Sequence, residues 1–426
     1  MATSDPAINS VLEILEQCDF FDRETGASRL LSADSSLVAF DFSSNAILMS
    51  RRSVFPGSSR LPQKLDEIPE LFDGLLKLAI RLDGDKDVLL TASGTACDAM
   101  VRRIGELFHI PVIALRIAPL DPEKLEAEAS RLTDGEEDVV LVFDFENRGI
   151  DFALANLADA VTVLSVRKGG NLHAAIAHRL ASGKPARVLV EPKLTKKKLG
   201  EELLSQGATG WVLFRANESE PGVGEIAADV RLAKDFDCSD FLLHWTRRRV
   251  GPWPDQTEMD FLDDLIFRSP RKDHREVASL RRILATEHIF AGNDLTRDPR
   301  PVVCFSDVTF EELKELRTFR PHLSRWDFEP FGVAIRKNWL IDQGAAAVVY
   351  GDEMVWESLP DDQRAFFQLN DPKGKVDWSV EREWRILGDL DLRKVPIDAA
   401  VAFVKSVEDA NEIAAFCRWP IVVLEE

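Results

Sequence analysis

The first half of the chain alternates between short, continuous apolar runs and longer segments in which apolar residues recur at helical spacing. Continuous apolar strands that alternate with amphipathic helices are typical of a mostly parallel sheet with helices on both faces. We therefore predict an α/β fold for this half. The predicted strands cover residues 36–42, 46–49, 88–90, 112–115, 139–143, 161–166, 188–190 and 210–214, and the predicted helices cover residues 7–21, 63–82, 96–108, 120–132, 171–181 and 195–206.

The second half mixes helices and strands without a regular strand-helix-strand order. This pattern predicts an α+β fold with a mixed or antiparallel sheet. Its predicted strands cover residues 241–247, 301–307, 331–335, 345–350 and 380–387, and its predicted helices cover residues 259–267, 276–288 and 310–319.

A linker-like segment separates the two halves. Residues 215–224 are rich in asparagine, glutamate, serine, proline and glycine, without periodic apolar positions. We predict a first domain over residues 1–215, a linker with a short helix over residues 216–237, and a second domain over residues 238–426. A chain of 426 residues is long enough for two such domains.

Two strand-to-helix junctions in the first half are candidate ligand loops. In a parallel sheet, ligands bind beyond the carboxyl ends of the strands, where glycines allow close approach and the amides at a helix start face an anion. A positive side chain in the second loop adds to this attraction. The loops consist of Ser93, Gly94 and Thr95, and of Arg167, Lys168, Gly169, Gly170 and Asn171. We interpret His173 and His178, on the following helix, as histidines with structural partners rather than metal ligands, and predict no metal site.

Around these loops, residues 30–215 resemble the SLOG superfamily, which includes DprA-type and lysine-decarboxylase-like proteins. The segments that carry the resemblance are residues 87–115 with Ser93-Gly94-Thr95 and Asp98-Ala99, residues 158–161 through Gly169-Gly170-Asn171, Ala175, Gly183-Lys184-Pro185 and Gly207-Ala208. The resemblance implies a Rossmann-like domain that binds a nucleotide or a nucleotide-derived signal. The phosphoribohydrolase branch carries a Pro-Gly-Gly-x-Gly-Thr-x-x-Glu motif, whose glutamate acts on the ribose. The segment Gly169-Gly170-Asn171-Leu172-His173 lacks that glutamate. The resemblance therefore favours a binder or sensor, and a nucleotide hydrolase centred on Gly169 and Gly170 is an alternative.

The second half carries polar residues at alternate positions of two predicted strands. His244 and Thr246 share one face of the strand over residues 241–247. Glu381 and Glu383, together with Arg385, share one face of the strand over residues 380–387. A structural interpretation is open for each pair. The first pair can bond to neighbouring backbone, and Arg382 or Arg385 can neutralise the glutamates. An exposed helix with an i,i+4 pair of Glu381 and Arg385 is also open.

The order of these segments resembles ADP-ribosyltransferase folds, especially DarT-type DNA ADP-ribosyltransferase toxins and AbiGi-type abortive-infection proteins. The resemblance covers residues 238–390. The matching motifs are His244-Trp245-Thr246, Cys304-Phe305-Ser306-Asp307, Phe331-Gly332-Val333-Ala334-Ile335, Ala347-Val348-Val349-Tyr350 and Glu381-Arg382-Glu383-Trp384-Arg385.

This resemblance implies NAD as a substrate and a role in bacterial anti-phage defence. His244 and Thr246 would hold NAD, and Glu383 or Glu381 would be the catalytic carboxylate, which stabilises an oxocarbenium-like transition state. One arginine of Arg317, Arg320 and Arg325 would clamp the pyrophosphate, although no motif fixes which one. Trp326 and Phe331 could stack on the nicotinamide, but aromatic residues there are more often part of a core. A non-catalytic nucleotide-binding and protein-interaction module is the alternative.

Composition and charge limit the classes of ligand and partner that the protein is expected to bind. A formal charge of −20 and a pI near 4.9 argue against a broad surface for nucleic acid or an anionic membrane, and favour a small ligand or a protein partner. The basic runs at residues 193–198 and 247–249 are more typical of solvated faces, and a nucleic-acid acceptor stays open. Five separate cysteines without a Cys-x-x-Cys motif, no signal-peptide pattern and no long apolar run predict a cytoplasmic protein.

Overall fold

The computed structural model describes residues 27–29, 38–40, 43–49, 68–95, 97–119, 121, 123–124, 127, 139–142, 147–191, 195–213, 229–293, 296–320, 325–370 and 377–425. The predicted helices over residues 7–21 and 120–132 and the linker-like segment lie wholly or largely outside these residues. The chain forms two compact units. Unit 1 comprises Met1–Asn217 and Gln256–Lys272, and unit 2 comprises Glu218–Asp255 and Asp273–Glu426.

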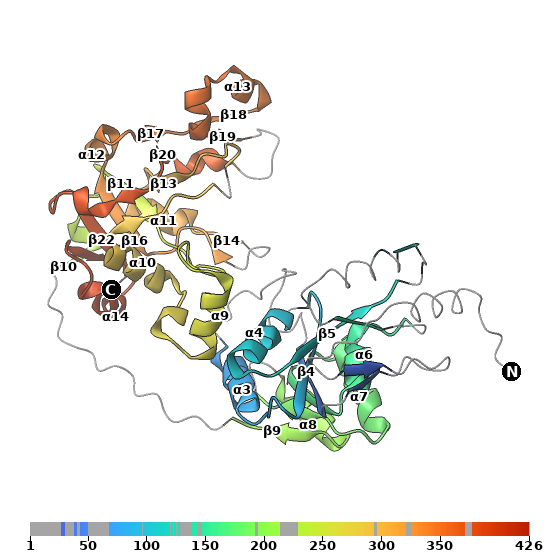
Figure 1. The fold of residues 1–426 in the computed structure, drawn as a ribbon. Coiled ribbons are helices and arrows are strands. Elements are labelled where there is room, and N and C mark those ends of the chain that lie inside the picture. Colours follow the sequence, from blue (N-terminus) through green and yellow to red (C-terminus); the bar gives the residue numbers. More distant parts are fainter. Residues whose placement is uncertain are drawn as a thin grey trace. The chain divides into compact units, whose positions relative to one another are not determined.

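Unit 1 is built on a seven-stranded, all-parallel sheet in the order β6-β5-β4-β3-β7-β8-β9. This confirms the predicted α/β fold with a Rossmann-like sheet. Figure 1 labels β4, β5 and β9 of this sheet. The strands are β3 (Ser43–Met49), β4 (Asp87–Ala92), β5 (Val112–Ile117), β6 (Val139–Val142), β7 (Ala160–Ser165), β8 (Arg187–Leu189) and β9 (Thr209–Trp211), and β1 (Ala27–Arg29) and β2 (Val38–Phe40) form a separate antiparallel pair.

Helices cover both faces of this sheet because its buried strands carry apolar residues at successive positions. Ile47 belongs to the apolar cluster that also contains residues of α3, α4 and α9, whereas Leu48 belongs to the cluster with residues of α6, α7 and α8. The helices are α3 (Pro69–Ala79), α4 (Asp98–Phe108), α6 (Ile150–Leu157), α7 (Asn171–Ala181), α8 (Lys197–Ser205) and α9 (Glu258–Ile266).

The order of the strands locates the topological switch point of this sheet. From β3 the chain builds outward through β4, β5 and β6, and α6 then leads back to β7 on the other side of β3. The carboxyl ends of β3 and β7 therefore form the topological switch point of the sheet. In open α/β sheets, ligands bind at this point.

Helix α9 lies in the second half of the sequence but packs in unit 1. Thr257 caps it through a reciprocal capping box with Asp260. Its apolar side chains Phe261, Leu262, Leu265 and Ile266 are all buried in the cluster that contains α3 and α4 residues. The sequence pattern identified this helix but not the unit to which it belongs.

Unit 2 contains an eight-stranded mixed sheet in the order β10-β23-β22-β16-β11-β13-β20-β17. Its pairs are antiparallel except at β22-β23 and β10-β23, which confirms the predicted α+β fold. The strands are β10 (Val230–Leu232), β11 (Phe241–Trp245), β13 (Val302–Ser306), β16 (Gly332–Arg336), β17 (Ala346–Ala347), β20 (Glu383–Leu387), β22 (Ala400–Val404) and β23 (Ile421–Val423).

Smaller elements complete unit 2. Three two-stranded sheets pair β12 (His288–Ile289) with β21 (Leu390–Asp391), β14 (Phe319–Arg320) with β15 (Arg325–Trp326), and β18 (Val349–Gly351) with β19 (Phe367–Leu369). Its helices are α10 (Glu276–Thr286), α11 (Phe310–Leu316), α12 (Lys337–Asp342), α13 (Glu353–Ser358) and α14 (Val407–Ala414). No helix in the described part of the chain is long and apolar enough to span a membrane.

The predicted strand over residues 380–387 is wrong in its first part. Residues Trp378–Glu381 form a 3-10 turn, and Arg382 adopts a left-handed conformation with φ 44°, so β20 begins only at Glu383. The left-handed residue breaks the strand geometry. Glu381 therefore does not share a strand face with Glu383.

Candidate functional site

The loop after β4, residues 93–95, is closed by a carboxylate. Gly94 has φ +71°, and its amide donates to Oδ2 of Asp98 at 3.0 Å. Asp98 is the first residue of α4 and also pairs with Arg102 at 3.0 Å. Arg116, at the end of β5, donates to the hydroxyl of Ser93 at 3.1 Å. The carboxylate of Asp98 is therefore already bound to the amide of Gly94, which an anionic ligand would otherwise use in this loop.

The loop after β7, residues 167–171, has a different charge balance. Gly169 has φ +71°, and the amide of Gly170 donates to the carbonyl of Arg167 at 3.2 Å. A Cβ atom at Gly170 would lie 3.6 Å from Nε of Arg167, so the guanidinium lies close to this glycine. Arg167 is exposed and has no ion-pair partner among the residues that the structure describes. Its charge is available to an anion.

The neighbouring Lys168 is already paired. Its Nζ lies 3.0 Å from Oε2 of Glu202 on α8, and Nε2 of His173 lies 3.9 Å from the other oxygen of that carboxylate. No local pattern indicates Glu202, because it lies on a different helix, 34 residues after Lys168. Asp98 belongs to the Asp98-Ala99 pair that the resemblance includes, and an acidic residue that opens a helix just after a glycine turn often binds a loop amide.

The two loops flank the carboxyl end of β3. Strands β4 and β7 each pair with β3, so their ends are about 10 Å apart, which is two interstrand spacings. The predicted loop residues Ser93, Gly94, Thr95, Lys168, Gly169, Gly170 and Asn171 therefore lie at one edge of the sheet, at the switch point. Among the described residues, no group of His, Cys, Asp or Glu side chains could hold a metal ion.

In unit 2, His244 and Thr246 bond to backbone carbonyls. Nδ1 of His244 lies 2.9 Å from the carbonyl oxygen of Cys304, and burial lowers the pKa of His244, so we assign a neutral ring that donates from Nδ1. Thr246 is buried, and its hydroxyl donates to the carbonyl of Glu276 at 3.2 Å. These contacts fit the structural interpretation of this pair.

The structure does not bring His244 to Glu383. Leu243 lies opposite Ser306, and Ser306 lies opposite Glu383, so these three side chains share one face of the sheet. His244 follows Leu243 on β11 and therefore projects from the other face. The NAD-binding and catalytic roles implied by the resemblance stay predictions, but they require a site that does not contain both residues.

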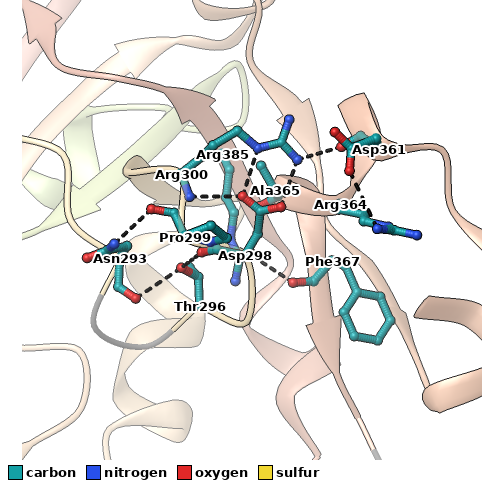
Figure 2. A network of polar contacts seen from close by, with 10 residues as sticks. All are labelled: Asn293, Thr296, Asp298, Pro299, Arg300, Asp361, Arg364, Ala365, Phe367 and Arg385. Atoms are coloured by element: carbon teal, nitrogen blue, oxygen red, sulfur yellow. Dashed lines mark hydrogen bonds and ion pairs between the residues drawn. The ribbon is translucent and has the colours of Figure 1, made fainter. Parts of the chain in front are cut away.

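Glu383 is held by the buried Arg385. Nε and Nη2 of Arg385 bind the two oxygens of Glu383 at 2.9 and 3.0 Å, and the two side chains are only 2% and 12% exposed. Figure 2 shows that Arg385 also binds the carbonyls of Ala365 and Phe367, at 3.0 and 2.7 Å. This is the neutralisation by arginine that the sequence left open for Glu383.

Polar residues from other matched motifs surround Glu383. The hydroxyl of Tyr350 accepts the amide proton of Glu383 at 2.9 Å, and burial raises the pKa of Tyr350 to about 12. Cys304 lies opposite Arg385 and is exposed, but desolvation by its neighbours and the charge of Glu383 raise the pKa of its thiol well above the usual range.

The remaining predicted residues do not form one clamp. The carbonyl of Glu381 accepts the hydroxyl proton of Ser306 at 2.5 Å. Arg317 binds Glu329 at 3.0 Å and lies 4.8 Å from the ring centre of Trp326. Arg320 and Arg325 oppose each other in the β14-β15 pair, but their side chains are outside the described part. Trp326 is 41% exposed and Phe331 is buried.

Comparisons with known proteins leave the family open. No family model and no curated protein matches the chain. A solved structure of DNA processing protein A from Helicobacter pylori, described for its single-stranded DNA binding mode, is similar to this chain at 14% sequence identity, with 49% of this chain and 88% of that chain covered. The TM-score is 0.27, so this similarity does not establish a shared family or function. The ligand class must therefore be inferred from the residues at the edge of the parallel sheet.

Proposed function

We propose that unit 1 binds a small phosphate-bearing ligand, a nucleotide or a nucleotide-derived molecule, at the carboxyl edge of its parallel sheet. The observation that carries this proposal is Arg167. It places an exposed guanidinium without an ion-pair partner among the described residues beside Gly170, at the start of α7 and at the switch point. Helix amides and an arginine together favour an anion with several acceptor oxygens.

The charge of the two loops orients the ligand. The Gly94 amide of the β4 loop is already bound by Asp98, whose charge is paired with Arg102, whereas the exposed guanidinium of Arg167 at the β7 loop attracts a phosphate. We therefore expect the phosphate at the β7 loop and an uncharged, hydrogen-bonding part of the ligand, such as a sugar hydroxyl, at the β4 loop. The separation of about 10 Å suits an extended molecule better than a bare phosphate ion.

Arg167→Gln is expected to weaken nucleotide binding about 10- to 100-fold, because a hydrogen bond to a charged group contributes about 1.5–3 kcal/mol. Titration calorimetry of the full chain with AMP, ADP, ATP, ADP-ribose and NAD measures this. Arg187→Gln is the matched control, because Arg187 is an exposed arginine at the amino end of β8, away from the carboxyl edge. If none of these ligands binds, or if Arg167→Gln binds as tightly as the unchanged protein, the proposal is wrong.

An NAD-consuming or ADP-ribosyl-transferring activity of unit 2 is a second proposal, supported by the resemblance of its motifs. The observation in its favour is that Tyr350, Cys304 and Glu383, from three separate motifs, lie around one position of the sheet. A carboxylate held in place by Arg385 can stabilise an oxocarbenium-like transition state. The separation of His244 from this position limits the proposal to a site on the Glu383 face.

Release of nicotinamide from NAD tests this second proposal. We expect slow release by the full chain, stimulated by the ligand of unit 1, and a loss of at least 100-fold in Glu383→Gln if its carboxylate stabilises the transition state. Glu353→Gln, which removes an exposed carboxylate on α13, is the control. Nicotinamide release that is equal in Glu383→Gln and the control would remove Glu383 from the mechanism, and no release with any of the tested nucleotides would count against an NAD-consuming enzyme.

A further inference from the structure

The path of the chain through α9 suggests a regulatory role for this helix. The polypeptide leaves unit 2 after Asp255, forms α9 in the apolar cluster of unit 1, and returns to unit 2 at Asp273. Both flanks of α9 are therefore covalently continuous with unit 2, although the helix itself packs in unit 1.

Helix α9 is attached to the helix that begins at the β4 loop. Nε and Nη2 of Arg103, on α4, bind the two carboxylate oxygens of Asp263, on α9, both at 2.6 Å. Apolar residues of both helices belong to one buried cluster. Helix α4 begins five residues earlier, at Asp98, whose carboxylate accepts a hydrogen bond from the amide of Gly94. A displacement of the first turn of α4 therefore acts on α9, because packed helices move as rigid elements.

The two flanks of α9 meet at one place in unit 2. The rings of Trp253 and His274 lie 4.2 Å apart, and the amide of Arg249 donates to the carbonyl of His274 at 3.0 Å. Asp255 forms an ion pair with Arg282 of α10, whose guanidinium also lies 5.0 Å from the ring centre of Trp253. The residues before α9, Trp253 and Asp255, therefore contact α10 directly, and His274, after α9, packs against Trp253.

Helix α10 in turn contacts the central strand β11. The carbonyl of Glu276, its first residue, accepts the hydroxyl proton of Thr246, and the hydroxyl of Ser279 donates to the carbonyl of Arg247 at 2.7 Å. A change in the flanks of α9 therefore reaches β11 through hydrogen bonds that the structure contains.

We propose that α9 transmits ligand binding in unit 1 to the α10 and β11 region of unit 2. This inference rests on the proposed function of the parallel sheet. A ligand that reaches the β4 loop from the β7 loop competes with the bond between Asp98 and Gly94, and so alters the start of α4. The coupling is reciprocal, so the state of α10 also changes the affinity of unit 1 for its ligand.

Hydrogen exchange of the full chain, with and without saturating ADP, tests the proposal. We expect the exchange of amides in α10 and β11 to change at least threefold on ADP binding. In Arg103→Met, ADP should bind within about threefold of its original affinity, while the change in α10 and β11 is lost. Arg81→Met, which removes an exposed arginine just after α3, should retain both the binding and the response.

Two further variants separate coupling from folding. Asp263→Asn keeps the shape of the side chain and should also lose the response, and the charge-exchanged pair Arg103→Asp with Asp263→Arg should restore it. If ADP does not bind, the tightest binder among AMP, ATP, ADP-ribose and NAD replaces it, and if none of these binds the unchanged protein, the proposed function and this inference both fail. If ADP binds and α10 does not respond, or if Arg103→Met and Asp263→Asn respond like the unchanged protein, the inference fails and the proposed function stands.

Discussion

Arg385→Met is expected to lower the free energy of unfolding by about 3–5 kcal/mol, because it leaves one member of a buried ion pair without its partner. Arg385 is 2% exposed and binds Glu383, the carbonyls of Ala365 and Phe367, and Oε1 of Gln368. Methionine fills part of the volume but donates no hydrogen bond. The carboxylate of Glu383 and both carbonyls would then be buried without these partners.

The chain contains a matched control for this prediction. Arg393 binds Asp391, the acidic residue two positions earlier, as Arg385 binds Glu383, but its side chain is 67% exposed. Arg393→Met should leave stability unchanged within error, because exposed ion pairs contribute little. Urea unfolding followed by circular dichroism measures both variants, provided that the slope with urea is the same. Equal midpoints for Arg385→Met and Arg393→Met would contradict the prediction.

Arg179→Met should cost about 3 kcal/mol or more of stability in unit 1. The guanidinium of Arg179 is almost fully buried and donates four hydrogen bonds to backbone carbonyls, at 2.5–2.8 Å. Three of these carbonyls belong to the end of α6 and the residues after it, where a helix has no partners of its own for them. The acceptors are the carbonyl oxygens of Ala155, Ala158, Asp159 and Pro185.

Differential scanning calorimetry of thermal unfolding measures this effect. Arg187→Met is the control, because it removes an exposed arginine from β8, the strand that follows α7. We expect a clear downward shift of the unit 1 transition for Arg179→Met and almost none for the control. An unchanged transition in Arg179→Met would mean that water satisfies the four carbonyls equally well, and would remove the structural role assigned to this arginine.

Much of unit 1 could be predicted from the sequence because its signals are local. The continuous apolar run at β4 and the glycine turn after it are properties of adjacent residues, and they identified a parallel strand and a loop at its carboxyl end. The bonds of Arg179 were not predictable. An arginine on a helix gives no sign that it will lie against the end of another helix instead of solvent.

The separation of His244 and Glu383 could not be predicted, because it depends on contacts between strands that are distant in the sequence. Alternation along the strand predicted correctly that Glu383 and Arg385 share a face, but it wrongly placed Glu381 on that face, because β20 begins only at Glu383. Whether two strands present the same face to one site depends on their register across a third strand, β13, and a shift of one residue reverses the answer. The register between strands is determined by packing over the whole sheet, so the sequence of one strand does not predict it.

The placement of α9 has a consequence for synthesis of the protein. A ribosome makes the amino-terminal part of a chain first, and such parts generally begin to fold before the rest appears. The apolar surface that α9 covers in unit 1 cannot be buried until residues Gln256–Lys272 have been made, after the first strands of unit 2. The nascent protein therefore carries an uncovered apolar surface on unit 1 during this interval, which is the period in which we expect chaperones to bind it.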